Sequence, residues 1–248
     1  MTKLYLTNKA LMAAIHESKL TYCSYVEPAH AYHDKIVNAL SEITPELIEE
    51  VRKKKAKPRG KKDQHVDPAT IPTESLVFRV MTFEHIPLAQ TTRPRRGKNL
   101  EYEKVPFPAF KHYIVKDGTP IEVLRSHWQG GIENGWFSHD HGKIKNDLAT
   151  MFMMLAERYG RRGNWRGYSY VDEMKAQAIV MLCQIGLQFD ESKSENPFAY
   201  YTTTMRNSFT KVLNNEKKVQ DIRDDLLIAA GSNPSHTRQF KDEWEARK

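Results

Sequence analysis

Apolar residues recur at steps of three and four in the second half of the chain, which is the spacing of one face of an α-helix. The pattern predicts three successive helices: one over 144–159, a second from Ser169 to Phe189, and a third that opens at Asn196. Serine and asparagine cap helices because their side chains accept hydrogen bonds from the first amide groups. The expected core faces are Ile144, Leu148, Met151, Phe152, Leu155 and Tyr159; Val171, Met174, Ala178, Met181, Leu182, Ile185 and Phe189; and Phe198, Tyr201, Thr202, Met205, Phe209, Val212 and Leu213.

The first half of the chain has a weaker and more varied pattern. It predicts two helices, over 7–20 and 44–55, the second opening on a threonine and a proline that suit a helix start. Residues 76–83 are rich in β-branched and aromatic side chains and predict a strand. Residues 112–115 and 121–124 flank a turn-forming segment and predict a hairpin, so we expect a small sheet within residues 74–130.

These elements predict a mainly α protein in which a helical core carries a small inserted mixed or β segment. We expect the helix within residues 1–20 to belong with the core formed by residues 144–220. Residues 21–143 would be the insertion, and residues 221–248 a helix, stopped by Gly231, followed by a polar tail.

Composition adds a charge preference. The 248 residues have a net charge of +7, a pI near 9.2 and 40% hydrophobic residues, which is enough for a core and favours an anionic partner such as nucleic acid. Cys23 and Cys183 are the only cysteines, without metal-site or disulfide spacing, so a reducing cytoplasm is expected. The sequence predicts no membrane span and no signal peptide.

A basic run stands out at residues 52–62, RKKKAKPRGKK, with eight bases and no acid. Such a run repels itself and is typical of mobile segments. It is interpreted either as an arm that binds phosphates non-specifically or as a solvated linker.

His139, Asp140 and His141 carry side chains that can bind metals. Their spacing lacks the i, i+4 geometry of a helical site, and no third ligand lies nearby. The favoured interpretation is a loop before the next helix, so the sequence predicts neither a metal site nor a cofactor.

Charge separates between the second and third predicted helices. Residues 168–195 hold five acids and two bases, whereas residues 196–220 hold four bases and one acid. The side of the third helix away from its apolar stripe presents hydrogen-bonding and basic groups, which suit nucleic acid. Its candidate DNA-binding residues are Tyr200, Thr203, Thr204, Asn207, Lys211, Asn214 and Lys218.

The stretch from Gly167 to Lys218 resembles the late-transcription sigma factors of T-even-type bacteriophages, divergent relatives of region 2 of bacterial primary sigma factors. The matching residues are Gly167-Tyr168, Glu173-Met174, Phe189-Asp190-Glu191, Lys193, Asn196-Pro197, Ala199-Tyr200, Thr202, Asn207, Phe209, Glu216 and Lys218. Residues 7–15, TNKALMAAI, resemble the family's opening helix. Together they cover about a quarter of the chain.

The resemblance implies a phage transcription factor that is not an enzyme and acts in the cytoplasm of the infected bacterium. It would recruit the host core RNA polymerase, by docking on the clamp helices of the largest subunit, to AT-rich minus-ten-like promoter DNA and assist its opening. The docking residues would be Glu173, Gln177, Gln184, Gln188, Asp190 and Glu191. A sliding clamp and a co-activator are further implied partners, although the tail offers only Phe240 and Trp244 for the family's hydrophobic clamp-binding motif.

Two other functions fit parts of the sequence. The chain would be a non-specific nucleic-acid-binding adaptor if the basic run carries its function, or a metal-dependent nuclease if His139 and His141 bind a metal. An adaptor binds DNA alone with a steep salt dependence, and a nuclease loses activity on chelation.

Overall fold

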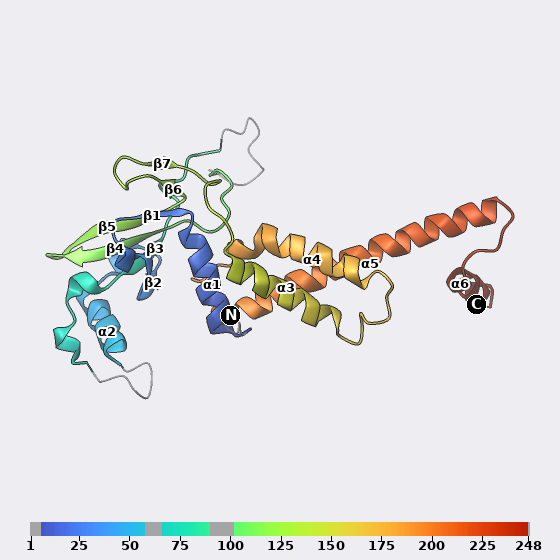
Figure 1. Cartoon of the computed structure of the whole chain (residues 1–248), viewed down its shortest axis with the longest axis horizontal. Helices are drawn as coiled ribbons and strands as arrows, with labels where there is room; N and C mark the ends of the chain where they lie inside the picture. Colours follow the sequence, from blue (N-terminus) through green and yellow to red (C-terminus); the bar gives the residue numbers. More distant parts are fainter. Residues whose placement is uncertain (1–5, 58–65, 90–101, 248) are drawn as a thin grey trace. The chain divides into compact units, whose positions relative to one another are not determined.

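The structure is a computed structural model of the chain and describes residues 6–57, 66–89 and 102–247. It comprises two compact units. The first contains Met1–Met151 and Ile185–Phe198, and the second contains Phe152–Gln184 and Ala199–Lys248. Figure 1 labels the elements along the chain.

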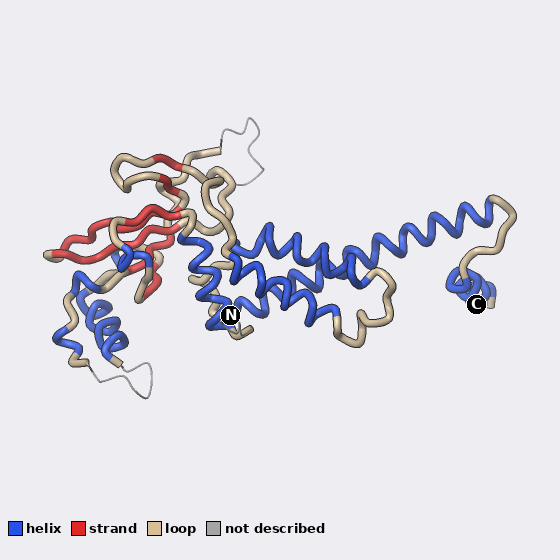
Figure 2. Tube along the Cα trace, in the orientation of Figure 1, coloured by secondary structure: helices blue, strands red, loops and turns tan. Residues whose placement is uncertain are grey.

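The expectation of a mainly α fold with a small inserted segment is wrong. The described residues form a mixed α/β fold that is 52% helical, with six α-helices, a five-stranded mixed sheet and a two-stranded sheet (Figure 2). The helices are α1 (Asn8–Leu20), α2 (Pro45–Ala56), α3 (Asn146–Gly160), α4 (Val171–Ile185), α5 (Pro197–Ala229) and α6 (His236–Ala246). The strands are β1 (Cys23–Tyr25), β2 (Lys35–Val37), β3 (Phe78–Met81), β4 (Phe110–Lys116), β5 (Thr119–Ser126), β6 (Trp128–Gln129) and β7 (Trp136–Phe137).

The large sheet of the first unit has the strand order β1-β5-β4-β3-β2, in which β2 and β3 are parallel and the other neighbours antiparallel. The predicted hairpin is confirmed as β4 and β5. Asp117 and Gly118 turn the chain there with φ values of 50° and 76°, which matches the left-handed backbone of tight hairpin turns. The strands β1 and β2 were not predicted, because three residues are too few to show an alternating pattern.

The two faces of this sheet are covered differently. Helix α2 packs its apolar side on one face, where Val51 joins Phe78 and Val115 in a buried cluster. On the other face Arg79 of β3 and His112 of β4 stand directly opposite each other, and both are almost completely buried. The sheet therefore has an apolar face and a face with a buried polar centre.

The predicted first two helices are confirmed, including their starts. Thr7 and Thr44 accept hydrogen bonds from the amides of Ala10 and Leu47, at 3.1 and 3.3 Å. These bonds satisfy donors that the first turn of a helix leaves without an intrahelical partner.

Aromatic rings fill the core of the second unit. Phe152 meets Tyr201 at a centroid distance of 5.0 Å, and Phe209 lies 5.0 Å from Tyr159 and 5.3 Å from Trp165. The periodicity thus identified most of the core, but Phe198 was assigned to it wrongly, because its side chain is 39% exposed.

The third predicted helix is longer than expected. Helix α5 continues for 33 residues, so the separate helix expected after residue 220 is its last part. Gly231 ends it as predicted, with a φ of 73°. The amides of Gly231 and Ser232 donate to the carbonyls of Ile228 and Leu227, which is a Schellman cap.

The residues after Gly231 were expected to form a polar tail. In the structure it forms α6, whose N-cap is Ser235. Asp224 of α5 accepts hydrogen bonds from the amide and the hydroxyl of Ser235, at 3.0 and 2.6 Å. Asp224 thereby fixes the start of α6 against α5.

Candidate nucleic-acid interface and the residues around it

One side of α5 forms a continuous polar and basic stripe. Its members follow one another at steps of three and four along the helix: Tyr200, Thr203, Asn207, Lys211, Asn214 and Lys218. All are exposed except Tyr200, which is half-buried. We call these six residues the α5 stripe.

The α5 stripe carries the positive charges of Lys211 and Lys218, and the first acid on the same side is Asp221, one turn after Lys218. Arg206 and Thr210 lie beside it, and together with Asn207 and Lys211 they line a shallow surface hollow. Sequence reasoning did not include Arg206 and Thr210 among the candidates, although Arg206 precedes Asn207 directly. Guanidinium, ammonium and amide groups are the usual donors to phosphate oxygens and base edges, so this surface can bind a nucleic-acid strand.

Thr204 does not belong to the α5 stripe. Its side chain is only 7% exposed, and its hydroxyl donates to the carbonyl of Tyr200 at 3.2 Å. The hydroxyl of Thr203 donates to the carbonyl of Ala199 at 3.1 Å but remains at the surface. The DNA-binding set predicted from the sequence therefore loses one member.

Tyr200 combines an aromatic ring at the surface with a protonated hydroxyl. Its ring lies 5.5 Å from that of Tyr201, which is completely buried. Burial raises the pKa of Tyr200, so the phenol stays neutral and its ring can stack on a base.

The docking residues expected on α4 lie along one side of the helix. Glu173 and Gln184 are exposed, and Gln177 is half-buried between them. Val180, which sequence reasoning did not select, falls on the same side and is 48% exposed. A single exposed apolar side chain is common on protein surfaces, so this side of α4 is distinguished mainly by its polar groups.

The other docking residues follow α4. Gln188 is exposed, whereas Asp190 accepts a hydrogen bond from the amide of Ser192 at 3.0 Å and forms an ion pair with Lys193 at 3.0 Å. Asp190 is therefore used in its own loop, with 17% of its side chain exposed.

Glu191 is the centre of a buried ionic cluster rather than a surface group. Its side chain is 5% exposed and forms ion pairs with Lys19 of α1, at 3.3 Å, and with Arg79 of β3. Lys19 also donates to the carbonyl of Phe189 at 2.8 Å. Glu191 is thus not available for docking as the sequence suggested, because it compensates two buried cations.

Arg79 uses its whole guanidinium group inside this cluster. Besides Glu191 it contacts two histidine rings, donating to Nε2 of His112 at 3.0 Å and to Nδ1 of His16 at 2.8 Å. The ring of Phe110 lies 3.9 Å below its guanidinium carbon. Both histidines must be neutral to accept these bonds, and their other nitrogens donate to the carbonyls of His30 and Ala31.

The pKa shifts agree with this arrangement. Burial and the neighbouring Arg79 lower the pKa of His16 to about 4, and they hold that of His112 well below its usual value. Burial opposes the ionisation of Glu191, but the charges of Lys19 and Arg79 outweigh it and keep its pKa below normal. At pH 7 the two histidines are therefore neutral, whereas Glu191, Lys19 and Arg79 are charged.

We expect stability to fall as the pH drops from about 6.5 towards 4. The unfolded chain takes up protons on its histidines in that range, whereas His16 in the folded chain does not, so the unfolded state is favoured. His16 alone should account for a loss of about 2 kcal/mol between pH 7.5 and pH 5. Urea titrations of the wild type and of His16→Gln test this, and an equal pH dependence in both would contradict it.

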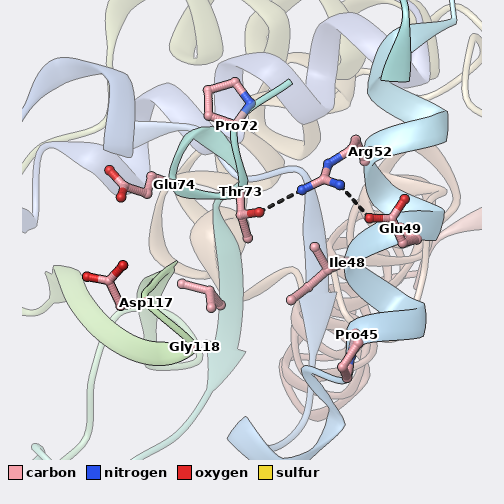
Figure 3. Close-up of a pocket in the computed structure, with 10 residues that line it drawn as sticks. Pro45, Ile48, Glu49, Arg52, Pro72, Thr73, Glu74, Asp117 and Gly118 are labelled. Carbon is pink, nitrogen blue, oxygen red and sulfur yellow. Dashed lines mark hydrogen bonds and ion pairs between the residues drawn. The ribbon is translucent and has the colours of Figure 1, made fainter. Parts of the chain in front are cut away.

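The basic run has two parts in the structure. Residues 52–57 belong to the end of α2 and the residue after it, and residues 58–62 lie outside the described residues. Figure 3 shows Arg52 in a hollow between α2 and the β4–β5 turn, bound to Glu49 and to the hydroxyl of Thr73. Lys55 pairs with Asp34 at 2.8 Å. The first part of the run is thus ordered helix rather than a mobile arm.

The nuclease interpretation rests on His139 and His141. His139 lies 3.3 Å from the carboxylate of its neighbour Asp140. Among the residues that the structure describes, no group of three or more histidine, cysteine or acidic side chains is placed to hold a metal ion.

Across the described residues, no helix combines the length and apolar character needed to cross a bilayer.

Comparisons with protein-family models, with curated proteins and with solved structures found no match to this chain.

Proposed function

We propose that the chain is a phage-encoded sigma factor for late transcription. It recruits the host core RNA polymerase to an AT-rich promoter element and assists promoter opening, acting by binding in the cytoplasm of the infected bacterium. The observation that carries the proposal is the α5 stripe, a surface of aromatic, amide and basic groups. It follows helix α4, one side of which carries Glu173, Gln177 and Gln184. The resemblance of residues 167–218 to late sigma factors supports the same assignment.

In this proposal α4 and α5 have separate partners. The side of α4 with Glu173, Gln177, Val180 and Gln184 contacts the basic clamp helices of the polymerase, while the α5 stripe contacts unstacked promoter bases and their phosphates. Opposite charge on the two surfaces favours this division, because a basic coiled coil and a phosphate backbone require complementary potentials.

The test is binding to bacterial core polymerase in a titration with immobilised chain. We expect the wild type to retain the polymerase and Glu173→Lys to weaken binding by about tenfold, since a charge-assisted hydrogen bond contributes roughly 1.5–3 kcal/mol. Glu245→Lys on α6 is the matched control, because its side chain is also exposed. Equal loss in both variants would contradict the proposed docking side.

A second candidate is a non-specific nucleic-acid-binding adaptor, which the net charge of +7 favours. Such a protein binds DNA without polymerase. The logarithm of its binding constant falls linearly with the logarithm of the salt concentration, with a slope of about −0.9 for each phosphate contacted. If the chain retains DNA fragments of particular sequence only when core polymerase is present, the result supports the sigma factor. Retention by the chain alone, with equal affinity for all fragments, supports the adaptor.

A further inference from the structure

Helix α5 has a heptad pattern that continues beyond the part of the helix that is packed in the core of the second unit. Taking Val212 as an a position, the a and d residues run through four heptads: Tyr201, Met205, Ser208, Val212, Asn215, Val219, Ile222, Leu226 and Ala229. A repeat of this length is typical of helices that pair with other helices.

The first half of this a/d seam is buried in the second unit. Tyr201, Met205, Ser208 and Val212 are at most 5% exposed. The second half carries apolar side chains at the surface, with Val219, Ile222 and Leu226 exposed by 59%, 51% and 66%. Figure 1 shows α5 continuing past the ends of α3 and α4 in this part.

Helix α6 does not occupy this seam. Its N-cap Ser235 is hydrogen-bonded to Gln220 and Asp224 of α5, and its Arg238 is bonded to Asp225. Those three residues of α5 lie at b, f and g positions, so α6 sits beside the seam and leaves Val219, Ile222 and Leu226 at the surface.

We propose that the second half of α5 pairs with the same segment of a second copy of the chain, in an antiparallel coiled coil. In antiparallel pairs, e positions face e positions and g positions face g positions of the partner helix. The residues flanking the seam are Glu216 and Arg223 at e, and Lys218 and Asp225 at g. With Val219 opposite Ile222 of the second copy, Glu216 meets Arg223, and Lys218 meets the exposed side of Asp225, whose carboxylate also pairs with Arg238 of α6. Each pair occurs twice.

The alternatives are disfavoured by the same charges. In a parallel dimer the g residue Lys218 would face the e residue Arg223 of the second copy, and this repulsion would offset the attraction between Lys211 and Glu216, whereas every charged pair in the antiparallel arrangement is attractive. Moving the antiparallel register one heptad towards the C-terminus would bring Arg223 against Arg223 and Asp225 against Asp225. The charge pattern therefore selects one orientation and one register.

The dimer is expected to be weak and reversible. Three apolar side chains per copy cover less than the roughly 1,200–2,000 Å² of a stable interface, and Leu226 faces the amide of Asn215 in this register. The proposal does not depend on the sigma-factor function, although Lys218 takes part in both surfaces.

Sedimentation equilibrium of the full chain tests the association. We expect the average mass to rise with concentration in the wild type, and Ile222→Asp to weaken association at least tenfold. Ile228→Asp is the matched control, because Ile228 is 47% exposed but lies off the seam at a c position. A wild type that stays monomeric, or an equal effect of both substitutions, would overturn the proposal.

Cysteine cross-linking tests the orientation. With exposed Cys183 replaced by serine, a mixture of Leu226→Cys and Asn215→Cys should form a disulfide-linked dimer. Leu226→Cys alone should not, because the two copies of residue 226 would be about 16 Å apart along the axis. Self-linking of Leu226→Cys would indicate a parallel dimer and overturn the proposed pairing. Restoration of association when Glu216→Arg and Arg223→Glu are combined, after loss in each alone, would support it independently.

Discussion

Replacing Glu191 by alanine is expected to lower the free energy of unfolding by about 3–5 kcal/mol, because the substitution leaves Lys19 and Arg79 as uncompensated buried cations. The cost of a buried charge without a partner exceeds the net contribution of the original ion pair. Glu191→Gln, which keeps the shape and loses the charge, should show a smaller loss.

The matched control is Glu195→Ala. Glu195 lies four residues further along the chain and is exposed, so its loss should change stability by less than about 0.5 kcal/mol. Urea denaturation of the three variants measures the difference. A similar midpoint for Glu191→Ala and Glu195→Ala would mean that the buried ionic cluster does not hold the sheet of the first unit to the segment after α4.

Replacing Phe209 by alanine should cost about 3–5 kcal/mol as well, through lost burial and the cavity left between Tyr159 and Trp165. Phe209 is completely buried, whereas Tyr200 is half-buried on the opposite side of α5. Tyr200→Ala should therefore cost about 1 kcal/mol or less.

Thermal unfolding of the two variants checks this pair. A melting temperature for Tyr200→Ala as low as that for Phe209→Ala would place Tyr200 in the core and remove it from the α5 stripe. The two results together thus determine the rotation of α5 on which the candidate DNA-binding surface depends.

The sequence predicted the helices well because their signals are local. Capping threonines at residues 7 and 44, and apolar residues spaced by three and four, depend on neighbours within a few positions. The same local logic placed the β4–β5 hairpin, where Asp117 and Gly118 provide the turn. These signals remain readable without knowledge of the fold.

The two short strands of the large sheet and the ionic cluster were not predictable in this way. Strands β1 and β2 are three residues long, and they are stabilised by pairing with β5 and β3 far along the chain. Glu191 lies in a polar loop sequence that favours exposure, yet its partners are 112 and 172 residues away. Long-range contacts of this kind leave no periodic trace in the sequence.

The candidate site was predicted in outline because helix periodicity is a local signal. The period of a helix brings Tyr200, Asn207 and Lys211 to one side, and the structure places them there. The error at Thr204 arose because Thr204 lies one residue further round the helix than Thr203, on the side of the buried residues Tyr201 and Ser208. Arg206 was omitted although the same geometry places it beside the stripe.

Promoter opening by the reconstituted holoenzyme tests the central claim most directly. Core polymerase and wild-type chain are combined on a DNA fragment that this holoenzyme selects, and permanganate reactivity of thymines is measured. We expect reactive thymines with the wild type, and reactivity reduced by about tenfold with Tyr200→Ala and Asn207→Ala, since stacking of one base contributes roughly 1–3 kcal/mol. Thymines that stay unreactive with the wild type, or equal reactivity in all three proteins, would contradict the assignment.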